Sequence, residues 1–155
     1  MKLLRRILIG LFIVVLIATL GFVIWAETPL PPSAEAIAAL RSDPEVIVSM
    51  DDYVTFKPAQ IDPTIAFVFY PGGRVDYRAY VVPLREIAKQ GYVVILLPVR
   101  FNLAFFDINA ADKVLDDFPQ IEHWVLGGHS LGGVAASLYA SKKDVFDGIV
   151  FWASY

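Results

Sequence analysis

The chain has 155 residues, of which 57% are hydrophobic and 19% are charged, and it contains no cysteine. This composition excludes an intrinsically disordered chain, which needs low hydrophobicity and high charge, and it excludes a disulfide scaffold. The lack of cysteine also excludes thiolate nucleophiles and cysteine-ligated zinc. The formal net charge is −3 and the sequence shows no basic patch, so nucleic acid is not an expected partner.

The first 26 residues have the features of a membrane anchor. Residues 7–26 carry no charged side chain, and a helix of this length rises about 30 Å, which matches the hydrocarbon core of a bilayer. Lys2, Arg5 and Arg6 precede this stretch, so the positive-inside rule predicts a cytoplasmic N-terminus and places the rest of the chain outside. A cleaved signal peptide is the alternative, although its apolar region is shorter and residues 24–26 make a poor cleavage site.

Apolar runs and amphipathic segments alternate along the rest of the chain. The proline-rich residues 28–33 predict a stiff spacer, and Ser33 can cap a short helix over Ala34–Arg41. Strands are expected at residues 46–50, 53–57, 65–70, 92–97, 123–126 and 148–153, and further helices at 80–90, 108–118 and 131–142. Most of these strands are apolar on both faces, which predicts an α/β fold: a mostly parallel sheet covered by helices on both faces.

A motif for a nucleophilic serine follows the fifth expected strand. Residues 128–132 read Gly-His-Ser-Leu-Gly, the G-x-S-x-G pattern, and they stand between a strand and a helix. In this context the pattern predicts a sharp turn that projects the hydroxyl of Ser130. Gly128 and Gly132 leave room for neighbouring backbone, and His129 occupies the variable position. A glycine-rich helix start that Ser130 merely caps is the alternative.

An acyl-transferring serine also requires backbone N–H groups that stabilise the oxyanion. The N–H of Leu131, directly after the serine, is the first expected donor. The second is expected in the turn after strand 65–70, where the sequence PGGR offers Gly73 and Arg74. A tight turn without this role is the alternative.

Here the sequence resembles the α/β-hydrolase fold enzymes, and among them the fold-5 type membrane-anchored hydrolases. The similar stretches lie between about residue 46 and residue 155 and include YPGG, GYVVILLP, the INAAD helix, EHWVLGGHSLGG and DGIVFWASY. The resemblance implies a serine hydrolase with Ser130 as nucleophile, oxyanion donors at Leu131 and in the Gly72–Arg74 turn, and ester-type substrates. Hydrolysis by this route needs neither a cofactor nor a metal.

The other two members of a catalytic triad are not found where this fold places them. Its chain order is serine, then acid, then histidine, but both His123 and His129 precede Ser130 and are interpreted as structural. Asp144 and Asp147 follow Ser130, yet they are expected at the opposite end of the sheet. We therefore expect a hydrolase fold truncated after its sixth strand, with the acid and the histidine in a segment that this chain lacks.

Four parts are expected: a cytoplasmic basic N-terminus (1–6), a transmembrane anchor (7–26), a linker with a short helix (27–45) and a partial α/β-hydrolase domain (46–155) outside the cytoplasm. The expected function is hydrolysis of a carboxylic ester or related small acyl compound through Ser130, with little activity in this chain alone. A non-catalytic, membrane-tethered binding or assembly domain is the alternative. The substrate is open, and Leu103, Phe105 and Phe106 are compatible with a wall of an acyl pocket or with packing under a loop.

Overall fold

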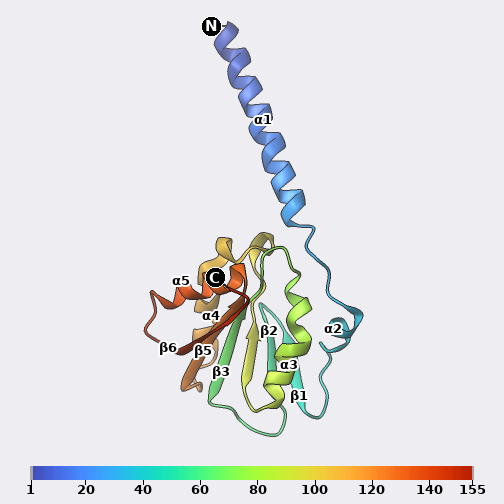
Figure 1. Ribbon diagram of the computed structural model, residues 1–155, viewed down its shortest axis with the longest axis vertical. Helices are drawn as coiled ribbons and strands as arrows, with labels where there is room; N and C mark the ends of the chain where they lie inside the picture. Colours follow the sequence, from blue (N-terminus) through green and yellow to red (C-terminus); the bar gives the residue numbers. More distant parts are fainter. Residues whose placement is uncertain (1, 155) are drawn as a thin grey trace.

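The computed structural model describes residues 2–154, which form one long helix, α1 (Lys2–Ala26), and a domain built on a six-stranded sheet (Figure 1). The strands are β1 (Val46–Met50), β2 (Val54–Pro58), β3 (Ile65–Tyr70), β4 (Val93–Leu96), β5 (His123–His129) and β6 (Phe146–Trp152), in the order β1-β2-β4-β3-β5-β6. The pairs β1–β2 and β2–β4 are antiparallel, whereas β4, β3, β5 and β6 run parallel. The predicted mostly parallel sheet is thereby confirmed.

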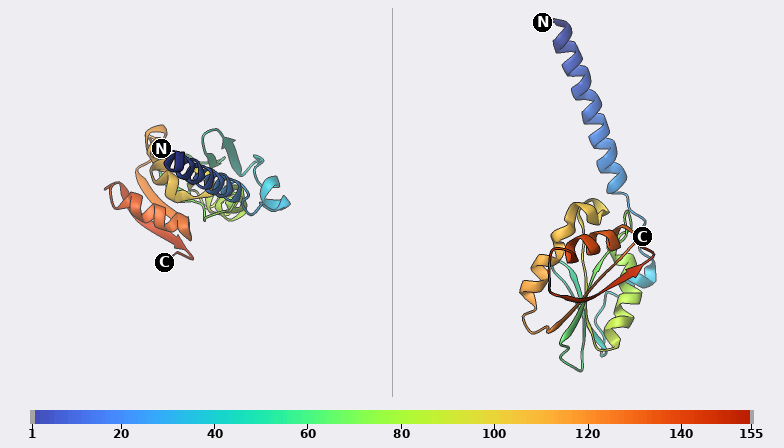
Figure 2. Two further views of the ribbon diagram at one scale, coloured as in Figure 1. Left: turned by 90° about the horizontal axis from the view of Figure 1, so that it is seen from above. Right: turned by 60° about the vertical axis from the view of Figure 1, so that its left-hand side comes forward.

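Helices pack on both faces of this sheet, as expected (Figure 2). The helical segments of the domain are α2 (Ala34–Ala38), η1 (Tyr77–Tyr80), α3 (Val81–Lys89), η2 (Arg100–Asn102), η3 (Ala104–Ala111), α4 (Asp112–Asp117) and α5 (Leu131–Ala140), where η marks a 3-10 helix. Along β3 the side chains of Val68 and Tyr70 pack with η3, α4 and α5, whereas those of Phe67 and Phe69 pack with α3. Because successive side chains of a strand point to opposite faces, one apolar run supplies both cores.

The helix expected over 108–118 differs from the structure, since its first half belongs to the 3-10 segment η3 and only Asp112–Asp117 is α-helical. The buried hydroxyl of Tyr70 donates to the carbonyl of Ile108 at 2.5 Å and accepts from the N–H of Ala111 at 3.2 Å. A buried phenol needs such partners, and here it takes backbone groups that a regular α-helix would use for itself.

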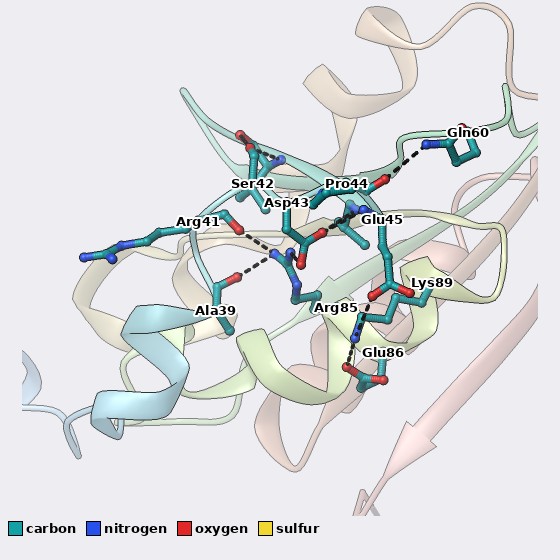
Figure 3. A network of polar contacts seen from close by, with 12 residues as sticks. Ala39, Arg41, Ser42, Asp43, Pro44, Glu45, Gln60, Arg85, Glu86 and Lys89 are labelled. Atoms are coloured by element: carbon teal, nitrogen blue, oxygen red, sulfur yellow. Dashed lines mark hydrogen bonds and ion pairs between the residues drawn. The ribbon is translucent and has the colours of Figure 1, made fainter.

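The linker is fastened to α3 by the buried side chain of Arg85 (Figure 3). Its guanidinium donates to the carbonyls of Ala39 and Arg41, each at 2.8 Å, and pairs with the carboxylate of Asp43 at 2.6 Å. A buried cation requires partners of this kind. The segment before β1 therefore packs as part of the domain.

Candidate active site

The turn between β5 and α5 holds Ser130 in an uncommon backbone conformation, with φ 50° and ψ −118°. Four hydrogen bonds fix it. The N–H of Ser130 donates to the carbonyl of Trp152 (2.9 Å), and its carbonyl accepts from the Ser154 hydroxyl (2.9 Å) and from the N–H groups of Gly133 (3.0 Å) and Val134 (3.4 Å). A positive φ in a residue other than glycine costs free energy and persists only where its surroundings impose it.

The glycines of the motif are required by close backbone contacts. A Cβ atom on Gly128 would lie closer than 3.0 Å to the backbone of Gly132. A Cβ atom on Gly132 would come equally close to the carbonyl oxygens of Tyr70 and Pro71. The start of α5 can therefore lie against the end of β3 only because these positions lack a side chain.

The turn after β3 lies beside the serine, because β3 and β5 are parallel neighbours with Tyr70 opposite Gly128. A Cβ atom on Gly73 would lie 3.1 Å from the side chain of Leu131. The N–H of Arg74 donates to the carbonyl of Asn102 at 2.7 Å, so Arg74 is not free to serve as the expected oxyanion donor.

The backbone N–H groups of Gly73 and Leu131 make no backbone hydrogen bond within residues 2–154. Of the expected donors, Leu131 and Gly73 therefore have an N–H without a backbone partner among the described residues, whereas Arg74 does not.

The hydroxyl of Tyr80 connects this turn to the serine turn. It accepts the N–H of Gly72 at 3.0 Å and lies 2.8 Å from Nδ1 of His129. Burial raises the pKa of the Tyr80 phenol, which keeps the hydroxyl protonated at neutral pH. Since Nδ1 of His129 is engaged with Tyr80, this nitrogen is not placed to take a proton from Ser130.

The remaining candidate bases lie at the other end of β5. His123 begins the strand, and its Nδ1 lies 3.4 Å from the carboxylate of Asp147, which also accepts the N–H of Trp124 at 2.9 Å. Seven residues of extended strand separate His123 from Ser130, which is about 20 Å. Among residues 2–154 no hydrogen bond to the Ser130 hydroxyl is present, and no cluster of His, Asp or Glu there could hold a metal ion.

A family model described as the alpha/beta hydrolase family matches residues 66–155. The chain belongs to the α/β-hydrolase family. Among curated proteins no match is found for this α/β-hydrolase.

Solved structures share the fold of this α/β-hydrolase. They include TT1662 from Thermus thermophilus, with a TM-score of 0.56 and 13% identity over 70% of this chain and 57% of that one. Brefeldin A esterase, a bacterial homologue of human hormone sensitive lipase, has a TM-score of 0.51 and 18% identity over 72% of this chain and 43% of its own. Carboxyl esterase 2 from the fungus Tuber melanosporum has a TM-score of 0.55 and 12% identity over 79% of this chain and 49% of its own. The α/β-hydrolase chain described here therefore spans about half the length of these neighbours.

Three further residues of this α/β-hydrolase shape the site without having been expected to do so: Tyr80, Asn102 and Ser154. Tyr80 was assigned only to the start of a helix, although a buried tyrosine indicates a polar partner. Asn102 had no assigned role, and Ser154 has no signal beyond its place after the last strand. Each of these residues contacts a residue far away in the sequence, and a local sequence pattern does not predict such a contact.

Proposed function

We propose that this chain is part of a serine hydrolase that cleaves a carboxylic ester or a related acyl compound through Ser130. The observation that carries the proposal is the imposed backbone conformation of Ser130, φ 50° and ψ −118°, at the turn between β5 and α5. Strained residues of this kind cluster at active sites, and a strand–serine–helix turn exposes the hydroxyl at the carboxyl edge of the sheet.

In the proposed reaction the Ser130 oxygen attacks the carbonyl carbon, and the N–H groups of Leu131 and Gly73 bind the oxyanion. A base takes the hydroxyl proton and passes it to the leaving alcohol, after which water hydrolyses the acyl-enzyme. We assign the base and its acid partner to a part of the protein outside residues 2–154, because His123 and His129 are engaged elsewhere. No cofactor or metal enters this reaction.

The test is turnover of an activated ester by the chain alone and by the chain joined to the downstream segment from its gene or from a longer relative. The chain alone should turn over very slowly, since losing the histidine of a triad costs on the order of 10⁶ in rate. The joined protein should be active and should label at Ser130 with a fluorophosphonate. Ser130→Ala should abolish both, whereas Ser137→Ala, on the exposed side of α5, should change neither.

A non-catalytic, membrane-tethered binding or assembly domain is the second candidate. It is favoured by one observation, namely that no residue in the described chain contacts the Ser130 hydroxyl as a base. If the joined protein folds but neither turns over an ester nor labels at Ser130, the enzyme proposal is wrong and the binding domain remains. Robust Ser130-dependent turnover by the chain alone would instead contradict the assignment of the base to another segment.

A further inference from the structure

The carboxyl end of α1 is bonded directly to the loops that carry the candidate site. The guanidinium of Arg74 donates to the carbonyls of Trp25 (2.9 Å) and Thr28 (2.8 Å) and lies 4.6 Å from the centroid of the Trp25 indole ring. The amide of Asn102 donates to the carbonyl of Ala26 at 3.0 Å, and Ala26 is fully buried. The base of α1 is therefore held against the turn that supplies Gly73.

Aromatic side chains surround this base, and we call Trp25, Phe101, Phe105 and Phe106 the aromatic collar. Phe22, one turn before the end of α1, has its ring centroid 5.9 Å from that of Phe101 and 5.8 Å from that of Phe106. Phe105 and Phe106 remain 59% and 46% exposed. Phe101 itself has a positive φ of 57°, so the chain accepts backbone strain in the segment that places this ring against the helix.

The depth of the aromatic collar in a membrane follows from its position along α1. Among residues 2–154, α1 is the one helix long and apolar enough to cross a bilayer, and all of it except Val23 and Ala26 at its carboxyl end is exposed. Phe22 lies four residues before Ala26, about 6 Å along the helix axis. If residues 7–26 span the hydrocarbon core, the rings that contact Phe22 reach the boundary between hydrocarbon and headgroups, where aromatic side chains are favoured.

The serine is at the same end of the domain. Ser130 and Gly73 follow β5 and β3, whose carboxyl ends lie together, and both figures show α1 leaving the domain at this end, near the start of α5 (Figures 1 and 2). The half-buried side chain of Leu103 lies between the collar and the site, since a Cβ atom on Gly73 would be 3.4 Å from it. Leu103 thus lies against the Gly73 turn and precedes Phe105 by two residues in the same segment.

We infer that the carboxyl edge of the sheet rests on the membrane surface and that Ser130 acts on the acyl ester of a membrane lipid. This inference rests on the proposed function and names its substrate class. An acyl chain in the facing leaflet reaches Ser130 along the collar and Leu103, whereas a water-soluble substrate would have to enter between the domain and the bilayer.

The orientation is tested with the full chain in phosphatidylcholine vesicles. Because the sequence contains no cysteine, Phe105→Cys and the control Ile61→Cys can each be labelled with a single fluorophore. Ile61 is similarly exposed, at 53%, but precedes β3 at the opposite end of the sheet. The label at 105 should be quenched by lipids with a headgroup-level nitroxide and be several-fold less sensitive to aqueous iodide than the label at 61.

Equal iodide quenching at both positions would overturn the inference. A label at 105 that is shielded from iodide without being quenched by the lipid nitroxide would also overturn it, because a second copy of the chain would then cover the collar.

The substrate class is tested on the chain joined to its downstream segment, with two fluorophosphonates of the same reactive group. A long-chain alkyl probe in vesicles should label Ser130 about tenfold or more faster than a short water-soluble probe, since an alkyl chain concentrates in the leaflet. The double change Phe105→Ser and Phe106→Ser should lower the labelling rate of the long-chain probe more than that of the soluble probe and so remove this advantage. Equal rates with both probes would overturn the lipid substrate alone. Labelling by neither probe would overturn the proposed function, while lipid quenching at position 105 would still decide the orientation.

Discussion

Ser130 keeps its conformation because groups from α5 and the end of β6 bond to its backbone. The carbonyl of Trp152 and the hydroxyl of Ser154 belong to the segment that follows α5, so the serine turn is completed by residues more than 20 positions away. Strain of this kind, of the order of 1–3 kcal/mol, is stable only while these contacts are made. The site therefore depends on close packing at individual positions.

Gly132→Ala tests this packing. The added methyl group would collide with the carbonyl oxygens of Tyr70 and Pro71, and backbone atoms cannot rotate away as a side chain can. We expect the free energy of unfolding to fall by about 1–3 kcal/mol or more, measured by chemical denaturation. Gly148→Ala is the matched control, because its methyl group meets nothing within 4 Å and should leave stability nearly unchanged. Equal stability of the two variants would show that position 132 has room for a methyl group, against the close contact described above.

Tyr80→Phe removes the hydroxyl that joins the Gly72 turn to His129. The buried N–H of Gly72 would lose its partner, which costs about 1–3 kcal/mol in the free energy of unfolding. The control is Tyr92→Phe, since the Tyr92 side chain is exposed and makes no hydrogen bond among the described residues. Denaturant unfolding of both variants measures the difference in stability. A Tyr80→Phe protein as stable as the control would show that the hydrogen bonds of the Tyr80 hydroxyl do not stabilise the fold.

At the scale of the elements, two ion pairs join the linker to α3, Asp43 with Arg85 at 2.6 Å and Glu45 with Lys89 at 3.5 Å, and the first is the shorter and more buried. The N–H of Val46, the Arg85 guanidinium and the N–H of Glu45 all bond to the Asp43 carboxylate, and they lower its pKa from 3.8 to about 2. A lowered pKa in the folded state means that this contact stabilises the fold above the unfolded-state pKa and is lost as the pH falls towards the folded one.

Asp43→Asn should therefore be less stable than the unaltered chain at neutral pH, and the difference should shrink between about pH 4 and pH 2. Thermal unfolding at a series of pH values measures it. Asp144→Asn serves as control, because Asp144 is exposed and forms no ion pair among residues 2–154, and it should follow the unaltered chain throughout. If the stability difference between Asp43→Asn and the unaltered chain stays constant down to pH 2, Asp43 is not the titrating group.

The open edge of β6 is the second element with a testable consequence. β6 pairs with β5 on one side, and Ile149, Val150 and Phe151 are 39%, 39% and 52% exposed. Exposed apolar edge strands template association between chains. We expect residues 27–155 to self-associate in light scattering and Phe151→Lys to reduce this more than Ile61→Lys, which adds the same charge in a loop. A monomeric, cooperatively unfolding 27–155 chain would contradict the prediction.

For the whole molecule, the charges around α1 predict the topology. Lys2, Arg5 and Arg6 precede the apolar stretch, whereas all 16 acidic residues follow Ala26. A reporter that requires export, joined to the carboxyl end of the chain, should therefore be active. A reporter that works only in the cytoplasm would contradict this orientation, and recovery of a soluble protein beginning near Glu27 would indicate a cleaved signal peptide instead.

The sequence by itself determined the elements whose signals are local. Strands 46–50 and 65–70 were predicted with the bounds that the structure has, because short apolar runs between turn residues favour strands. The run 65–70 is buried on both faces, whereas 46–50 is an edge strand that is largely exposed. The serine turn was predicted from its glycines, since the steric demand of a strand–turn–helix connection is itself local. The α/β order and the α/β-hydrolase family follow from the same patterns.

Only the tertiary structure decided which groups meet. Three contacts between distant segments illustrate this: the Arg74 N–H bonds to the carbonyl of Asn102, the Tyr80 hydroxyl joins Gly72 to His129, and the Tyr70 hydroxyl bonds to Ile108. The attachment of Arg74 to the end of α1 is of the same kind. Two groups form a hydrogen bond when folding brings them within reach of each other. Residue type and spacing along the chain do not reveal which distant groups come that close.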